Sequence, residues 1–159
     1  MDEYIFVLAK SEEIPEIVDI YNGLVGTPGC TWSFDYPNKE TAEYDIKKDS
    51  LYVLKKNKKI IAVATVGSFN ELNDLEWKPK NPCELHRIGV ISTMLNQGIG
   101  TILLQNTIKT VKELKYDGMR FLVSKKNISA LALYDKIGFE RCGEVFMHDI
   151  DFYCYQIVF

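Results

Sequence analysis

A turn containing two glycines joins a strand-like segment to a long amphipathic segment in the middle of the chain. Residues 83–90 have strand character, the turn reads N-Q-G-I-G at residues 96–100, and the following segment has helical periodicity from Ile99 onward. Glycines spaced G-x-G let the backbone turn tightly and point N–H groups outward, and the helix adds the positive end of its dipole. The order predicts a phosphate-binding loop, although an ordinary turn has the same spacing.

A second segment, at residues 127–139, reads N-I-S-A-L-A-L-Y-D-K-I-G-F. It has the features of a short helix, with Asn127 at its start and Gly138 at its end. Together the two segments resemble the signatures of the GNAT superfamily of acetyl-CoA-dependent N-acetyltransferases. The first is similar to the R/Q-x-x-G-x-G/A loop of that superfamily, and the second to its N-x-x-A-x-x-L-Y-x-K-x-G-F motif. The strong resemblance covers roughly residues 83 to 140.

The pattern of the whole chain predicts one α/β domain spanning residues 1–159. We expect strands at 4–8, 51–55, 60–66, 83–90, 119–124 and 152–159, and helices at 11–21, 38–48, 99–117 and 127–137. The resemblance implies a mixed, mostly antiparallel central sheet of about six to seven strands with helices on both faces. It also implies a V-shaped splay after the strand at 83–90.

The resemblance implies acetyl-CoA as co-substrate and indicates which residues would bind it. The loop would hold its phosphates through Leu95, Asn96, Gln97, Gly98, Ile99, Gly100 and Thr101. The strand residues Ile88, Gly89 and Val90 would pair with its pantetheine, and Asn127 and Tyr134 would complete the site. Leu95 stands where Arg or Gln is usual, and we expect weaker binding, with Gln97 compensating. Gly89 within a strand indicates a bulge or a close backbone approach.

Two titratable residues in the 83–90 strand are candidates for the base that deprotonates an amine. Strand alternation predicts that Glu84, His86, Ile88 and Val90 share one face. The resemblance implies a Glu or His base at one or both of the first two positions, and we expect Glu84 to be the main base and His86 the second. A solvated carboxylate and a packed core imidazole are the alternatives.

Tyr134 is implied by the resemblance as the general acid that protonates the departing thiolate. It lies seven residues after Asn127, almost two helical turns, so the two side chains share a face. A packed core aromatic is the alternative for Tyr134, and Asn127 also suits a helix cap.

Composition excludes several classes of partner. With 19 Lys+Arg against 22 Asp+Glu, the chain lacks the basic excess that nucleic-acid binding needs. No apolar run approaches the roughly 20 residues of a membrane span, and the first residues are acidic where a signal peptide is basic. Cysteines 30, 83, 142 and 154 are scattered and only two histidines are present, so we expect no metal site and free thiols. These features predict a cytoplasmic protein without nucleic-acid or membrane partners.

The expected activity is acetyl transfer from acetyl-CoA to a primary amine by direct attack in a ternary complex. The acceptor is a small amine, an amino acid, an antibiotic or a peptide N-terminus. We expect its pocket to form from the 24–37 loop, the acidic 69–77 segment and the last strands. The alternative is a non-catalytic acyl-CoA-binding or regulatory domain, which Leu95 favours and the retained Glu84, His86 and Tyr134 disfavour. Residues 153–159 suggest a homodimer in which these strands pair.

Overall fold

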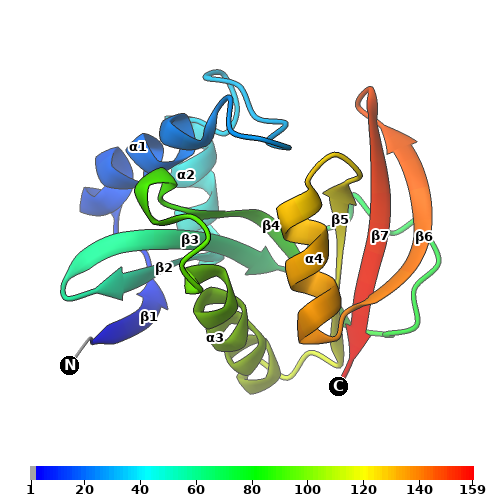
Figure 1. Cartoon of the computed structure of the whole chain (residues 1–159). Coiled ribbons are helices and arrows are strands. Elements are labelled where there is room, and N and C mark those ends of the chain that lie inside the picture. Colours follow the sequence, from blue (N-terminus) through cyan, green and yellow to red (C-terminus); the bar gives the residue numbers. More distant parts are fainter. Residues whose placement is uncertain (1–2) are drawn as a thin grey trace.

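The computed structural model describes residues 3–159 as a seven-stranded mixed sheet with four α-helices packed against it (Figure 1). The strands are β1 (Tyr4–Leu8), β2 (Leu51–Lys56), β3 (Lys59–Gly67), β4 (Pro82–Val90), β5 (Gly118–Ser124), β6 (Glu140–Met147) and β7 (Ile150–Val158). The helices are α1 (Ile14–Leu24), α2 (Lys39–Lys47), α3 (Ile99–Glu113) and α4 (Ile128–Ile137). No helix within residues 3–159 is long and apolar enough to cross a membrane.

The strand order is β1-β2-β3-β4-β5-β7-β6, and every neighbouring pair is antiparallel except β4 and β5. The parallel pair is short, because only Pro82–Glu84 of β4 pairs with Gly118–Arg120 of β5. Beyond Glu84 the two strands diverge, which confirms the predicted splay and places its start inside β4. The expected mixed, mostly antiparallel sheet is also confirmed.

Helices cover both faces of the sheet, as predicted (Figure 1). On one face α1 and α2 pack on β2 and β3, and α1 buries Ile14, Ile17 and Tyr21 at the spacing of one helical face. On the other face α3 and α4 enclose the larger core, to which α3 contributes Leu103 and Leu104. The sheet is therefore fixed from both sides around the point where β4 and β5 separate.

Helix boundaries follow local sequence signals. Asn38 caps α2 by accepting a hydrogen bond from the Thr41 N–H, as expected for its position. Gly138 ends α4 in the left-handed conformation, with a φ of 105°. Three helix bounds differ from the prediction by three or more residues: α1 begins at Ile14 after a 3-10 turn over residues 11–13 and ends at Leu24 instead of residue 21, and α3 ends at Glu113 instead of residue 117.

Three structural expectations are wrong. Strand β6 was not predicted, because it is largely exposed on both faces and lacks an alternating pattern. Strand alternation does not keep Glu84, His86, Ile88 and Val90 on one face. The reason is a break at Arg87, which has a φ of 44° and lies where the pairing of β3 with β4 shifts register. Ile88 and Val90 consequently pack against the α3 core. Strand β7 lies between β5 and β6, so both its edges are paired and it cannot pair across a dimer.

Candidate functional site

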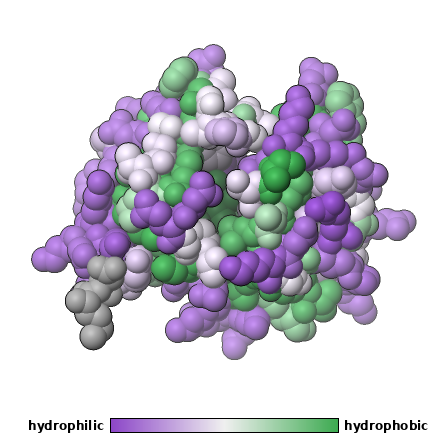
Figure 2. All heavy atoms as spheres, viewed as in Figure 1, coloured by the Kyte–Doolittle hydropathy of each residue, from purple (hydrophilic) through white to green (hydrophobic). Residues whose placement is uncertain are grey.

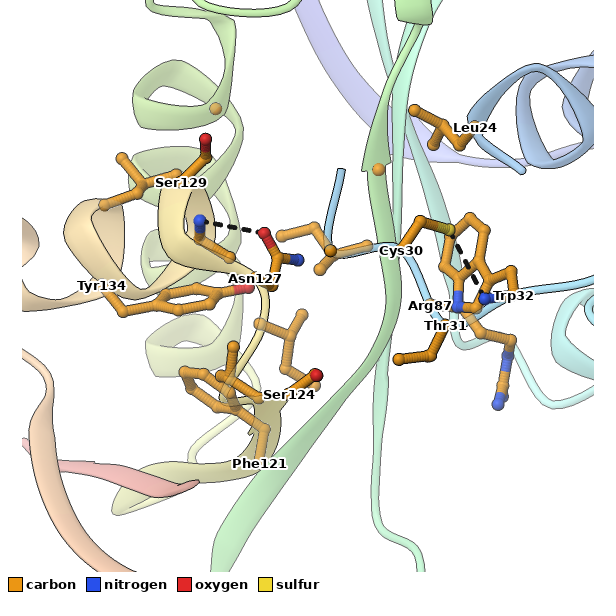
Figure 3. A pocket seen from close by; sticks show the side chains of 18 of the residues that line it. Leu24, Cys30, Thr31, Trp32, Arg87, Phe121, Ser124, Asn127, Ser129 and Tyr134 are labelled. Carbon is orange, nitrogen blue, oxygen red and sulfur yellow. Dashed lines mark hydrogen bonds between the residues drawn. The ribbon is translucent and has the colours of Figure 1, made fainter. Parts of the chain in front are cut away.

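A cavity of about 1190 Å³ lies where β4 and β5 diverge. Its walls are formed by β4, the start of α3, α4, the loop over residues 27–32 and the turn between β6 and β7. Figure 2 shows this hollow at the centre of one face, with apolar residues around it, and Figure 3 shows side chains that line it. The splay of the sheet therefore produces an open site between β4 and β5.

The predicted phosphate loop lies at the start of α3, and Gly98 and Gly100 line the cavity. Gly98 is the N-cap, with a φ of 79°, and a Cβ added there would meet nothing within 4 Å. Within residues 3–159, the backbone N–H groups of residues 96–101 have no protein acceptor. Free amides at the positive end of a 15-residue helix fit an anion such as a pyrophosphate. The residues present therefore suit the diphosphate of acetyl-CoA.

Gly100 has a different role from Gly98. A Cβ added at Gly100 would lie 2.9 Å from Leu133 Cδ2 on α4. Its lack of a side chain lets α3 and α4 pack closely, so this glycine fixes the wall of the cavity. Leu95 and Asn96 line the cavity, and the Gln97 side chain bonds the Thr93 carbonyl at 3.4 Å.

The free edge of β4 faces the cavity. Residues 85–90 pair with β3 but have no partner on the β5 side among the described residues. Unpaired strand groups accept an extended ligand as an added strand, which suits the amides of pantetheine. The bulge in β4 is at Arg87, and Gly89 serves a close approach instead, because a Cβ there would lie 2.6 Å from Leu24 Cδ1.

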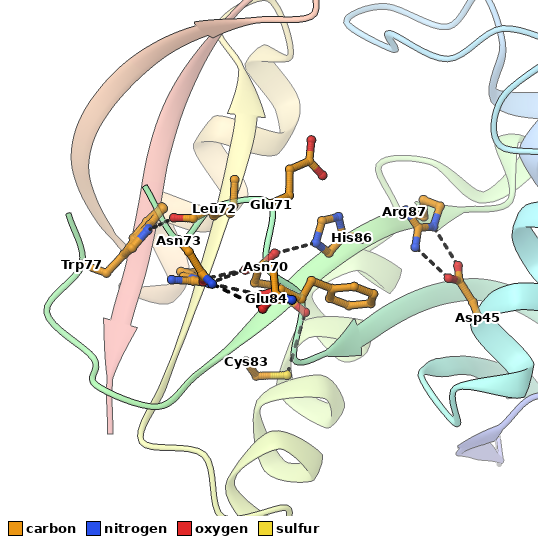
Figure 4. Close-up of polar contacts among 12 residues, drawn as sticks. Asp45, Asn70, Glu71, Leu72, Asn73, Trp77, Cys83, Glu84, His86 and Arg87 are labelled. Atoms are coloured by element: carbon orange, nitrogen blue, oxygen red, sulfur yellow. Dashed lines mark hydrogen bonds and ion pairs between the residues drawn. The ribbon is translucent and has the colours of Figure 1, made fainter. Parts of the chain in front are cut away.

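Glu84 and His86 form one hydrogen-bonded pair (Figure 4). The Glu84 side chain is 0% exposed, its Oε1 lies 2.9 Å from His86 Nε2, and its Oε2 accepts from Arg120 Nε at 2.9 Å and Nη2 at 2.5 Å. Two guanidinium N–H groups thus bond to one oxygen of the Glu84 carboxylate, and an ion-paired carboxylate accepts hydrogen bonds without donating any. The Nε2 of His86 is therefore the donor, and Nδ1 carries the lone pair.

Arg120 joins this pair to the 69–77 segment. Its Nη2 also donates to Asn73 Oδ1 at 2.6 Å and to the Phe69 carbonyl at 3.3 Å, while Trp77 stacks on the guanidinium at 5.7 Å. The Phe69 ring meets the His86 ring edge-on at 4.6 Å. The 69–77 segment thus encloses the cluster of Glu84, His86 and Arg120. Arg120 was missed in the sequence, because a strand pattern gives no sign of a partner 36 residues away.

Tyr134 extends from α4 into the cavity wall, as Figure 3 shows. Its ring packs on Phe121 and Phe139, and burial raises the pKa of its phenol. No hydrogen bond joins the Tyr134 hydroxyl to another residue in the range 3–159, so the hydroxyl remains available to a ligand. Asn127 caps α4 by accepting from the Ala130 N–H at 3.2 Å and also lines the cavity.

The expected acceptor pocket takes only some of the expected residues. Loop residues 27–32 and Tyr36 line the cavity, and so does Glu71, whose carboxylate lies 3.0 Å from His148 Nε2. Three other acidic residues of the 24–37 and 69–77 segments, Asp35, Asp74 and Glu76, are not among the lining residues. Arg87 also lines it and is paired with the buried Asp45 at 2.7 Å, a contact with no sequence signal. The acceptor side of the cavity therefore carries a negatively charged side chain, Glu71, and a positively charged one, Arg87.

The four cysteines are free thiols. Cys83 is buried on the α3 side of β4, and burial raises its pKa to about 12. A thiol with so high a pKa is a poor nucleophile at neutral pH. Within residues 3–159, no three His, Cys, Asp or Glu side chains lie together in a way that would hold a metal ion.

Comparison with known proteins gives one consistent result. Residues 17–139 match the family described as "Acetyltransferase (GNAT) family". The chain is similar in structure to an acetyltransferase of the GNAT family from Streptococcus agalactiae 2603, with a TM-score of 0.83 and 20% identity over 98% of this chain and 95% of that chain. It is similar to an N-acetyltransferase from Staphylococcus aureus Mu50, with a TM-score of 0.78 and 20% identity over 98% of both chains.

A third similar structure is a Salmonella typhimurium protein solved with its cofactor acetyl-CoA, with a TM-score of 0.78 and 16% identity over 98% of this chain and 94% of that chain. At these identities the structural likenesses show the fold. No curated protein sequence matches the chain.

Proposed function

Because this chain belongs to the GNAT family of acetyltransferases, we propose that it transfers the acetyl group of acetyl-CoA directly to a primary amine. The observation that carries the proposal is the cavity between β4 and β5, which combines free amides at the start of α3 with an imidazole and a phenol. The free amides of residues 96–101 would bind the diphosphate, and the free edge of β4 would bind the pantetheine.

We propose His86 as the base, with Glu84 as the residue that positions it. This reverses the order expected from the sequence, because both carboxylate oxygens of Glu84 are engaged and the side chain is fully buried. With Nε2 bound to Glu84, the Nδ1 of His86 is left to act as the base, and the side chain is 19% exposed and lines the cavity. His86 takes the ammonium proton, the neutral amine nitrogen bonds to the thioester carbonyl carbon as the C–S bond breaks, and the nitrogen releases its second proton to solvent as the amide forms.

Tyr134 then donates its phenolic proton to the departing thiolate and regains a proton from solvent. Burial raises the pKa of Tyr134 and keeps that proton in place until the sulfur becomes negative. The attack needs no covalent enzyme intermediate, and the buried Cys83 offers none.

We also propose that residues 1–159 form one acetyltransferase domain, since β1 and β7 lie outside the matched range yet pair within the same sheet. Four free cysteines support the proposal of a cytoplasmic enzyme, because reducing compartments keep thiols free.

The test is release of free thiol from acetyl-CoA across a panel of primary amines, with calorimetry of CoA binding in parallel. We expect amine-dependent thiol release by a protein that binds CoA. CoA binding without turnover of any amine would instead support the non-catalytic alternative.

A further inference from the structure

The β4 bulge brings two consecutive residues to the same side of the sheet. Neighbours in a regular strand point to opposite faces. Here His86 pairs with Thr65, and both Thr65 and Arg87 bond to Asp45 of α2, so His86 and Arg87 face the same way. Arg87 adopts a left-handed φ of 44°, which is costly for a residue with a side chain. Bulges of this kind re-aim side chains next to active sites.

Asp45 holds the Arg87 guanidinium by one edge only. The carboxylate accepts from Nε and Nη2, each at 2.7 Å, and Nη1 donates to Tyr36 Oη at 2.9 Å. A guanidinium has five N–H groups, so two remain without a partner among the described residues. Since Asp45 is fully buried and also bound by Thr65, the guanidinium is fixed in advance of any ligand.

Tyr36 adds a second donor beside the guanidinium. Its oxygen accepts from Arg87, so its own O–H proton is free for another acceptor, and both side chains line the cavity. Among the described lining residues, Arg87 is the one Lys or Arg and Glu71 the one Asp or Glu. A cavity that presents the fixed Arg87 cation and the Glu71 carboxylate complements a zwitterion better than a simple cationic amine, which the guanidinium repels.

We propose that Tyr36 and Arg87 form a carboxylate subsite, and that the acceptor is an amine that also carries a carboxylate, as an α- or ω-amino acid does. The carboxylate receives the free N–H groups of Arg87 and the hydroxyl proton of Tyr36, as charge-assisted hydrogen bonds. The amine then lies toward His86. This inference rests on the proposed acetyl transfer and names its substrate class.

The test compares acids with their amides as acceptors: L-leucine with L-leucinamide, and 4-aminobutyrate with 4-aminobutanamide. Each kcat/KM is calculated from the concentration of the unprotonated amine, so that acids and amides are compared on the same basis. We expect at least one acid to exceed its amide by about tenfold or more. Tyr36→Phe should reduce that preference about tenfold through KM, with kcat little changed. The matched control is Tyr44→Phe, because Tyr44 is equally exposed (54% against 52%) and does not line the cavity.

Arg87→Gln alone would leave the buried Asp45 unpaired, so it is made together with Asp45→Asn. This double variant should lose the preference for the acid entirely. Equal kcat/KM for acids and amides in the wild type would overturn the subsite while leaving acetyl transfer intact. An unaltered preference for the acid in both Tyr36→Phe and the double variant would also overturn the subsite.

A binding measurement keeps the two proposals separate. Calorimetry on the CoA complex compares N-acetyl-L-leucine with N-acetyl-L-leucinamide, two product analogues that differ in the carboxylate. Tighter binding of the acid, lost in Tyr36→Phe, supports the subsite even if no amine is acetylated, a result that would refute only the proposed reaction. Equal binding of the two compounds would overturn the subsite.

Discussion

The imidazole of His86 is joined to the carboxylate of Glu84 by a 2.9 Å hydrogen bond through Nε2. The bond fixes the tautomer, because a carboxylate paired with Arg120 accepts and does not donate. The proposed chemistry follows from this one contact: Glu84 orients, and the Nδ1 of His86 takes the proton.

Replacement of His86 tests the base. His86→Asn should lower kcat/KM by roughly 10²-fold or more while leaving the affinity for CoA unchanged, since the imidazole lies on the acceptor side. A variant with wild-type kcat/KM would remove His86 from the mechanism.

Arg120 is predicted to contribute both to the stability of the fold and to activity, and two variants distinguish these contributions. Arg120→Met leaves the Glu84 carboxylate buried without its cation, so the free energy of unfolding in urea should fall by about 3–5 kcal/mol. The double variant Arg120→Met with Glu84→Leu removes both charges and should regain most of that stability without regaining activity.

Lys78→Met provides the comparison for Arg120. It breaks the exposed Lys78–Glu140 pair and should barely move the urea midpoint. A double variant as active as the wild type would show that the buried pair serves folding alone.

The phosphate loop is tested at Gly98, whose left-handed φ of 79° Asn and Asp tolerate and whose Cβ has open space. Gly98→Asp places a carboxylate where the pyrophosphate is proposed to bind, and Gly98→Asn has the same shape without the charge. Calorimetry should show CoA affinity at least about tenfold lower in the Asp variant than in the Asn variant. Equal affinities would exclude this loop as the phosphate site. Gly100 is unsuitable, because any side chain there meets Leu133.

Much of the fold was predictable because short-range sequence patterns determine most of its helices and strands. The stripe of apolar residues in α3, the cap at Asn38 and the hairpin of β2 and β3 are each encoded within a few neighbouring residues. Strand β6 was not predictable in this way, because its residues are exposed on both faces and it is held by pairing with β7.

Individual residues of the site were predictable from the sequence, but the contacts between them were not. The sequence places Glu84 and His86 two residues apart, which suggests two alternative bases. Which of them is accessible depends on Arg120, a residue of another strand. The left-handed φ of Arg87 has no signal at all, since Arg is not a residue that favours it. Strand alternation therefore fails at the position where the backbone departs from a regular strand.

Tyr134→Phe is expected to separate binding from chemistry. The variant keeps the ring that packs on Phe121, so folding and CoA affinity should be preserved while kcat falls by roughly 10²-fold. Because burial raises the pKa of Tyr134 above the ordinary value of 10.0, the phenol stays protonated at lower pH. Wild-type kcat should therefore show no loss from its deprotonation below about pH 10. Unchanged kcat in the variant, with chemistry limiting, would assign Tyr134 to packing.

The central claim is direct transfer of acetyl from acetyl-CoA to an amine, and mass spectrometry of the products and of the intact protein tests it most directly. With acetyl-CoA and an accepted amine, we predict one N-acetylated amine for each free thiol. With acetyl-CoA alone, we predict a protein of unchanged mass. Thiol release without an N-acetylated product, or a protein that gains the mass of an acetyl group and passes it to the amine, would contradict the account.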